Sequence, residues 1–232
     1  MSAMSEAGIS GGIEEDGRIF IVRHAESAAN AGGRTGDPAT IPITESGARQ
    51  AERAAQLIST RPAVIVVSRY SRTVQTAAPL SKRYPGVPVE RWPVEEFTYL
   101  DIAACAGTTY AEREGLRDAY WSRCDPLWAD GPRCESFSIF IGRVREFEHA
   151  LSLREAAETV VVFTHGLIMQ ALLWLQQHSS VKTDRVSMQD FDRLRRIISV
   201  PNCAVMRAAT NGGGRITLSP NVIVAHLRAE GH

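Results

Sequence analysis

Four short apolar runs cross the chain, and polar residues follow each of them. The runs cover residues 19–23, 63–68, 87–94 and 159–164. Short runs rich in Val and Ile predict β-strands that are buried on both faces. Two later segments, 204–210 and 215–220, flank the glycine-rich sequence 211–214 and are predicted to be strands joined by a turn.

Helical spacing of apolar residues dominates the stretches between these strands. Helices are predicted over residues 45–60, 71–84, 135–151, 166–177 and 190–198. Thr44 precedes the first of them and carries the hydroxyl of a helix cap. Pro79 lies inside the second, where its missing N–H should break, kink or restart the helix.

The alternation of strands and helices predicts an α/β fold. We expect a three-layer α/β/α sandwich with a mainly parallel central sheet. The segment 95–131 fits neither pattern and is rich in aromatic and small residues, so we expect an irregular or helical excursion over the functional site. Residues 1–17 are rich in Gly, Ser and acidic side chains and are predicted to be a flexible leader to a single domain, 18–232.

The charge balance leaves no global basic field. The chain has 26 Lys and Arg residues against 26 Asp and Glu residues, so we expect no nucleic-acid partner. No apolar run approaches the roughly 20 residues of a membrane helix. The N-terminus lacks the basic and apolar regions of a signal peptide. The four cysteines form no CxxC pair and are expected to be free thiols, which indicates a cytoplasmic protein. No membrane partner is expected, because no apolar run is long enough.

Polar groups stand at the carboxyl ends of three predicted strands. They are Arg23 and His24; Ser68 with Arg69 and Arg72 close behind; and Thr164, His165 and Gly166. In open parallel sheets, ligands bind outside the carboxyl ends of the strands. If the three strand ends are neighbours, they bring two imidazoles and several guanidiniums into one small volume.

A cluster of guanidiniums is repulsive unless an anion lies within it. The planar fork of arginine matches the oxygens of phosphate, and helix N-termini after the strands add backbone donors. We therefore expect a phosphate group as ligand. A neutral imidazole can attack phosphorus, and a second, protonated imidazole can stabilise charge on the phosphoryl oxygens.

Five motifs resemble those of the histidine phosphatase superfamily, which includes the cofactor-dependent phosphoglycerate mutases. They are RHAES followed by Asn30, PITESGARQA with Ile43 in place of leucine, SRYSRTVQTA, CESFSIFIGRV and VVVFTHG. The motifs occur in the order of that family and span residues 18–173. The resemblance implies a histidine-phosphatase-like catalytic domain and a phosphoryl-transfer site.

The resemblance also implies a role for each matched residue. His24 attacks phosphorus and becomes phosphohistidine. The phosphoryl group is clamped by Arg23, Arg72 and His165, and Asn30 adds a hydrogen bond. No metal or cofactor is expected, since the arginines supply the positive charge.

A carboxylic acid must protonate the leaving oxygen and then activate water. The resemblance implies that it follows the third strand, where Glu95 and Glu96 stand. Glu96 is favoured because its offset from Trp92 resembles the mutase pattern. Burial and the charge of the phosphate would both raise the pKa of Glu96, as its role as a general acid requires.

The sequence departs from the family pattern in three places. Ala25 replaces a glycine of the first motif, and Cys134 replaces a glycine before the helix near 135. The segment after the glutamates lacks the tyrosine-glycine pair and the basic residues of the mutases. This favours a phosphoric monoester hydrolase of the histidine acid phosphatase type, with a small phosphorylated substrate. The alternatives are a phosphoglycerate mutase-type transferase and a non-catalytic member that binds a phosphorylated ligand.

Several side chains near these motifs have simpler interpretations. Arg69 is expected to be solvated or paired with an acid rather than to contact phosphate. The aromatic residues of the excursion and its flank form either core or pocket walls, and their crowding favours walls; they are Trp92, Phe97, Tyr99, Trp121 and Trp128. The sequence leaves open the natural substrate, which the excursion should select, and whether the chain forms a homodimer.

Overall fold

The computed structural model describes residues 18–178, 181–211 and 215–224. The predicted leader and most of the glycine-rich turn lie outside the described residues. The strands are β1 (Ile19–Arg23), β2 (Val64–Val67), β3 (Val89–Arg91), β4 (Val160–Thr164), β5 (Ala204–Thr210) and β6 (Ile216–Val224). All six predicted strands are therefore present, although β3 is confined to the middle of the expected run and β6 extends beyond it.

One six-stranded sheet contains all of these strands, in the order β3-β2-β4-β1-β5-β6. The pairs β2–β3, β2–β4 and β1–β4 are parallel, whereas β5 pairs antiparallel with β1 and β6. The prediction of a mainly parallel α/β sheet is confirmed. The central strands β2, β4 and β1 are neighbours, and this places their carboxyl ends side by side.

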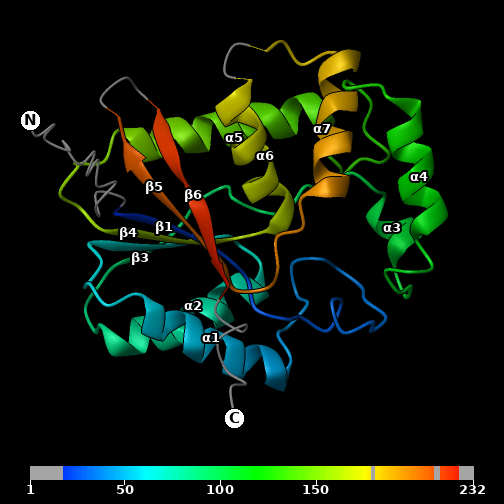
Figure 1. The fold of residues 1–232 in the computed structure, drawn as a ribbon. Helices are drawn as coiled ribbons and strands as arrows, with labels where there is room; N and C mark the ends of the chain where they lie inside the picture. The colour runs from blue at the N-terminus through cyan, green and yellow to red at the C-terminus, as the bar shows by residue number, and fades with distance from the viewer. Residues whose placement is uncertain (1–17, 179–180, 212–214, 225–232) are drawn as a thin grey trace, which may run out of the picture.

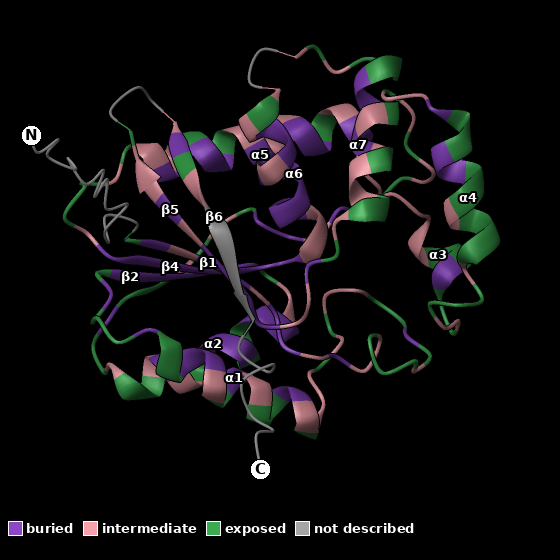
Figure 2. Ribbon diagram, in the orientation of Figure 1, coloured by how far each residue is buried: buried purple, intermediate pink, exposed green. Residues whose placement is uncertain are grey.

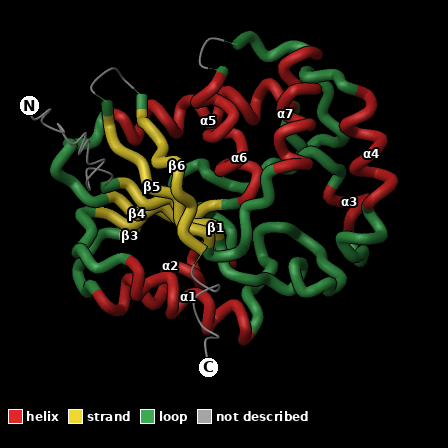
Figure 3. The backbone as a smooth tube through the Cα atoms, viewed as in Figure 1, coloured by secondary structure: helices red, strands yellow, loops and turns green. Residues whose placement is uncertain are grey.

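Helices cover both faces of the sheet (Figures 1 and 3). One layer holds α1 (Glu45–Leu57) and α2 (Ser71–Arg83). The other face carries α5 (Phe137–Ser152), α6 (Gly166–Gln177) and α7 (Arg185–Ile197). Beside this second layer lie α3 (Ile102–Cys105) and α4 (Glu114–Arg123), which belong to the predicted excursion.

Three helix predictions were wrong in detail. Pro79 does not break or restart α2, since a single helix of 13 residues runs through it. The helix expected from residue 135 begins at Phe137, because the Ser136 side chain accepts the Ile139 N–H as its cap. The short helix predicted over 190–198 starts five residues earlier, at Arg185 after the Asp184 capping box. The Thr44 cap of α1 is confirmed, since its side chain accepts the Gly47 N–H.

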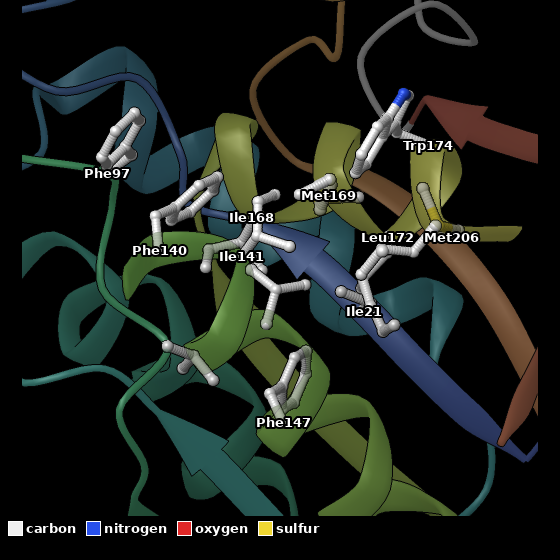
Figure 4. Packing of buried hydrophobic residues seen from close by; sticks show 14 of the residues in the cluster. Ile21, Phe97, Phe140, Ile141, Phe147, Ile168, Met169, Leu172, Trp174 and Met206 are labelled. Atoms are coloured by element: carbon white, nitrogen blue, oxygen red, sulfur yellow. The ribbon is translucent and has the colours of Figure 1, made fainter. Parts of the chain in front are cut away.

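Successive residues of the central strands point to opposite faces, and both faces are buried (Figure 2). Toward α1 and α2, residues such as Val22 and Ile65 contribute to one core cluster. Toward α5 and α6, a larger cluster forms, in which Ile21 of β1 packs with side chains of α5 and α6 (Figure 4). This packing fixes the strand ends relative to one another on a rigid support.

The aromatic residues of the excursion belong mainly to this larger core. Phe97 and Trp121 are buried in it, and Trp92, Tyr99 and Trp128 pack against it. Their interpretation as pocket walls is therefore wrong for the two buried residues. Because these rings pack into the core, their large apolar area is removed from water and the excursion is held against the sheet domain.

Candidate active site

The carboxyl ends of β1, β2 and β4 bring the predicted polar groups together. His24 follows β1, Ser68 follows β2 and His165 follows β4 as the residue before α6. The centroids of the two imidazole rings lie 5.1 Å apart. Arg72, in the first turn of α2, donates from Nη2 to His165 Nδ1 at 3.1 Å. The sheet thus assembles both imidazoles and a guanidinium at one edge.

His24 is buried and its ring is held in one orientation. Nδ1 lies 2.8 Å from the carbonyl oxygen of Ala25. A carbonyl only accepts, so Nδ1 carries the hydrogen and Nε2 keeps its lone pair. Burial, reinforced by the charges of Arg72 and Arg23, lowers the pKa of His24 well below 6.5. At neutral pH the free ring is therefore uncharged and presents a basic nitrogen.

Arg23 and Arg72 supply positive charge near this ring. Burial lowers the pKa of Arg23, and it lowers that of Arg72 to about 10, so both remain cations at neutral pH. Arg23 donates from Nη1 to the Val200 carbonyl, whereas its Nε has no hydrogen-bond partner in this structure. Because an unpaired buried donor is costly, Arg23 Nε is a candidate ligand for an anion.

Arg72 and Ser68 together fix the tautomer of His165. Ser68 Oγ lies 2.9 Å from His165 Nε2 and 2.9 Å from Thr73 Oγ1, and the Thr73 hydroxyl donates to the Tyr70 carbonyl. Arg72 can only donate to Nδ1, so His165 Nε2 carries the hydrogen and Ser68 accepts it. Burial and the cation of Arg72 lower the pKa of His165 well below 6.5. The free site therefore holds a neutral His165, whereas the protonated ring expected from the sequence belongs to the site with a phosphoryl group bound.

The two candidate acids differ sharply in their partners. Glu95 is buried and paired with Arg69, whose Nε lies 2.8 Å from its Oε1, so the expectation that Arg69 pairs with an acid is confirmed. Glu96 is half-buried, and its Oε1 accepts the backbone N–H groups of Phe97 and Leu167, both at 3.1 Å. Burial raises the pKa of Glu96 above 4.5 despite the opposing cations of Arg72 and Arg23.

Gly166 lies between Glu96 and Arg23. A Cβ built on it would be 3.8 Å from Glu96 Oε2 and 3.5 Å from Arg23 Nε. The missing side chain of this first residue of α6 leaves room beside an unpaired donor and a carboxyl oxygen. The helix N-terminus adds its own positive potential to this space.

Asn30 lies at the rim and is exposed. Its Oδ1 accepts from the Ser27 N–H at 3.2 Å, from Ser27 Oγ at 2.9 Å and from Asn202 Nδ2 at 3.1 Å. The loop that follows Asn30 is tied to the excursion by the Arg34–Glu112 ion pair and by a backbone bridge from Thr35 to Thr108. The excursion thus approaches the site through residues near 108.

Two of the three departures from the family pattern, Ala25 and Cys134, are accommodated by ordinary geometry. Ala25 does not have a positive φ, and its methyl group is buried with Ala51, Ala54 and Cys203. Its N–H donates to Thr76 Oγ1 at 3.0 Å. Cys134 precedes a helix start that Ser136 caps in the normal way.

Four further residues support the site without having been assigned a role from the sequence. They are Ser68, Tyr70, Thr76 and Asn202. Tyr70 stands edge-on to His165, with ring centroids 5.3 Å apart and Arg72 over its ring. Thr76 is the last residue of the motif SxxxRxxxT, so that motif could have indicated its role. Asn202 lies far from the motifs in sequence and gave no such signal.

No group of three or more His, Cys, Asp or Glu side chains within the described residues is arranged to hold a metal ion. All four cysteines are free, as predicted. Over the same part of the chain, no helix has the length and apolar character needed to cross a membrane.

A family model described as histidine phosphatase superfamily (branch 1) matches residues 19–221. No curated protein sequence matches the chain significantly. Several solved structures do. Phosphoserine phosphatase from Entamoeba histolytica in complex with 3-phosphoglyceric acid has a TM-score of 0.64 at 18% identity, covering 88% of this chain and 95% of that one.

Two other structures are similar to the same extent. The alpha-ribazole phosphatase from Shigella flexneri has a TM-score of 0.64 at 20% identity, over 89% of this chain and 95% of that one. A mycobacterial glucosyl-3-phosphoglycerate phosphatase has a TM-score of 0.62 at 23% identity, over 87% of this chain and 96% of that one. At these identities the likeness establishes a shared fold.

Proposed function

The chain belongs to the histidine phosphatase superfamily, branch 1, and from that premise we propose that it is a phosphomonoester phosphatase working through a phosphohistidine on His24. The observation that carries the proposal is the neutral His24 ring among cations. Its Nδ1 lies 2.8 Å from the Ala25 carbonyl, which leaves the lone pair on Nε2, and the ring lies near His165 and the cations of Arg72 and Arg23. This is the arrangement that a nucleophile toward phosphorus requires.

In the first step, His24 Nε2 forms a bond to phosphorus while the bond from phosphorus to the ester oxygen breaks. The guanidiniums of Arg23 and Arg72 balance the charge of the phosphoryl oxygens. Arg23 Nε contributes its unpaired N–H to one of these oxygens. Asn30 donates its amide N–H from the rim, since its Oδ1 is already occupied.

His165 joins the clamp once the phosphoryl group has bound. The anion attracts Arg72 and favours the protonated form of the His165 ring, because an opposite charge nearby raises a histidine pKa. The ring then donates to a phosphoryl oxygen while Ser68 keeps it in position.

Glu96 acts as the acid of the first step and the base of the second. Protonated, it gives its proton to the leaving oxygen; ionised, it takes a proton from the water that attacks phosphohistidine and releases orthophosphate. Its raised pKa suits the first role, and both its Oε2 and Arg23 Nε border the space at Gly166. Glu95 is engaged by Arg69 and is not proposed as the acid.

Hydrolysis rather than transfer is favoured by two observations. The segment after Glu96 folds its aromatic rings into the core, and the similar structures named above are phosphatases. We assign the enzyme to the histidine acid phosphatase type and expect a small phosphorylated substrate whose leaving group contacts the excursion near Thr108. The free thiols support a cytoplasmic location.

The test is a panel of phosphate monoesters with wild-type protein and His24→Ala. We expect orthophosphate release and an acid-labile, base-stable phosphoenzyme in the wild type, and neither in the variant. Undiminished turnover by His24→Ala would overturn the mechanism. Phosphoryl exchange between three-carbon acids that depends on a bisphosphate primer would instead identify a mutase, and phosphate binding without turnover would identify a non-catalytic member.

A further inference from the structure

We propose that Asn202 is a positioning residue that orients the amide of Asn30 and holds the backbone of the nucleophile, an inference that rests on the proposed function. Asn202 lies in the turn between α7 and β5, about 180 residues from the first motif. Its Nδ2 donates to the His24 carbonyl at 3.0 Å and to Asn30 Oδ1 at 3.1 Å. A single amide nitrogen thus joins the nucleophile residue to the predicted phosphoryl ligand.

The orientation of the Asn30 amide follows from its partners. The backbone N–H of Ser27 can only donate, so the oxygen of the Asn30 amide must face it. Asn202 Nδ2 and Ser27 Oγ donate to the same oxygen. Rotating the amide by half a turn would direct an NH₂ group at two groups that can only donate, the Ser27 N–H and Asn202 Nδ2. Asn30 is therefore fixed with its two N–H donors facing away from them, available for an anion.

The turn that carries Asn202 also holds the carbonyl end of β1. The Cys203 N–H approaches the Arg23 carbonyl at 3.2 Å and the His24 carbonyl at 3.4 Å, and the Ala204 N–H closes the turn on Pro201. Cys203 has a φ of 55°, in the left-handed region that a residue with a side chain rarely adopts. That strained conformation allows both Asn202 Nδ2 and the Cys203 N–H to reach this strand end.

Asparagine suits this position because its NH₂ group has two hydrogens on one nitrogen. Aspartate has the same shape but would direct an oxygen at two acceptors, the His24 carbonyl and Asn30 Oδ1. Serine offers one hydrogen for the two acceptors. The side chain is thus required for what it donates, and an isosteric substitution tests this directly.

The experiment is a double-mutant cycle on Asn202→Asp and Asn30→Ala. Two quantities are measured: the dissociation constant for inorganic phosphate by calorimetry, and kcat and KM for a phosphate monoester. We expect Asn202→Asp to weaken phosphate binding and to lower kcat/KM by on the order of 10- to 100-fold, the effect of losing charge-assisted hydrogen bonds. Adding Asn30→Ala to Asn202→Asp should cause little further loss, because the two residues act through one contact.

Asn202→Ser is the conservative variant and should recover part of the loss. Val144→Ala, in the core of α5, controls for general destabilisation and should leave phosphate binding unchanged. Full additivity of the two substitutions, or unchanged phosphate affinity in Asn202→Asp, would overturn the proposed role. If the wild type binds inorganic phosphate without turnover, only the proposed function is contradicted, because the double-mutant cycle can still be evaluated from the dissociation constants for phosphate. A wild type that does not bind phosphate defeats both.

Discussion

Ser68 Oγ lies 2.9 Å from His165 Nε2 and accepts the hydrogen that this nitrogen carries. Arg72 donates to the other ring nitrogen, so Ser68 must accept. A neutral imidazole exchanges its tautomers readily unless such partners select one. A buried serine that carries no chemistry of its own therefore stabilises, together with Arg72, one tautomer of a proposed catalytic ring.

Ser68→Ala should lower kcat by about 10- to 100-fold. The His165 Nε2–H would be left buried without an acceptor, at a cost of about 1–3 kcal/mol. The loss would favour the tautomer with its hydrogen on Nδ1, which would face the N–H of Arg72. Steady-state kinetics and the ¹⁵N shifts of the His165 ring measure the two consequences. Ser71→Ala removes a nearby hydroxyl that donates only to the Ala39 carbonyl and should have little effect. Wild-type turnover in Ser68→Ala would contradict the argument.

Gly166→Ala should weaken phosphate binding without unfolding the protein. The new methyl group would lie at ordinary contact distances, 3.5 Å from Arg23 Nε and 3.8 Å from Glu96 Oε2, so the fold tolerates it. It would, however, occupy the space beside the unpaired Arg23 donor. We expect the dissociation constant for inorganic phosphate to rise by about 10-fold or more.

Gly142→Ala is the matched control for this variant. Gly142 lies within α5, and a Cβ there would meet nothing within 4 Å. It should gain up to about 1 kcal/mol of stability, as alanine does in a helix, and keep its phosphate affinity. Equal phosphate affinities of the two variants would show that the space at Gly166 is not used by the ligand.

Ala25→Gly should destabilise the protein by about 1–2 kcal/mol and leave catalysis nearly unchanged. The backbone at Ala25 does not need glycine, since its φ is not positive, and the methyl group is fully buried against Ala51 and Ala54. The loss combines a buried methyl group with the greater flexibility of an unfolded glycine. Urea denaturation measures it. A variant more stable than the wild type would mean that alanine strains this turn.

The sequence predicted the sheet because its signals were local. The apolar runs at β1, β2 and β4 end in polar residues, and the rule for parallel sheets then places those ends together. The order of the strands was not needed to anticipate the cluster, only their adjacency. The sequence pattern therefore indicates His24, Arg72 and His165 as members of this cluster.

The sequence could not predict contacts that arise from distant chain segments. Asn202 reaches His24 only because β5 pairs with β1, and nothing in the pattern around residue 202 signals this. Pro79 was expected to interrupt a helix because its ring removes one hydrogen bond, but the helix continues, with Ala77 and Leu80 buried on either side of it. At Pro79 tertiary packing outweighs the local signal, and at Asn202 strand pairing creates a contact for which no local signal exists.

Glu96→Gln should discriminate between substrates by their leaving groups. An alkyl phosphate needs a proton on its leaving oxygen, so its kcat/KM should fall at least 100-fold. The p-nitrophenolate of p-nitrophenyl phosphate leaves without being protonated, so kcat/KM for that ester should fall much less. The alkyl ester should also lose the alkaline limb of its pH profile. Burial raises the pKa of Glu96, and activity that needs its protonated form falls as the pH rises through that value.

Glu95→Gln is the control for the acid. It removes the partner of Arg69, whose side chain is 75% exposed, so the ion pair contributes little and turnover should change by less than about threefold. If Glu95→Gln shows the leaving-group dependence and Glu96→Gln does not, the two glutamates exchange roles. Comparing both variants on both esters therefore assigns the acid without a bound ligand.

The stability of the free protein should fall as the pH decreases from 7.5 to 5.5. His24 and His165 have pKa values well below 6.5 in the folded protein, whereas an unfolded histidine titrates near 6.5. The stability that they contribute is complete above 6.5, and it is lost as the pH falls through that value toward the lower folded pKa values. Each histidine then lowers the free energy of unfolding by up to about 1.4 kcal/mol per pH unit.

Urea denaturation across this pH range measures the effect. His165→Gln should remove about half of the slope, whereas His149→Gln, which changes an exposed histidine of α5, should leave it intact. Glu96 has the opposite effect on the pH dependence, because a carboxyl group with a raised pKa contributes stability that is lost as the pH rises through that pKa. Measuring the slope in the Glu96→Gln variant separates the contribution of Glu96 from that of the histidines. Inorganic phosphate should flatten the slope, since an anion between the rings favours their protonated forms. A slope unchanged by both His165→Gln and phosphate would mean that the two buried rings do not titrate as the geometry requires.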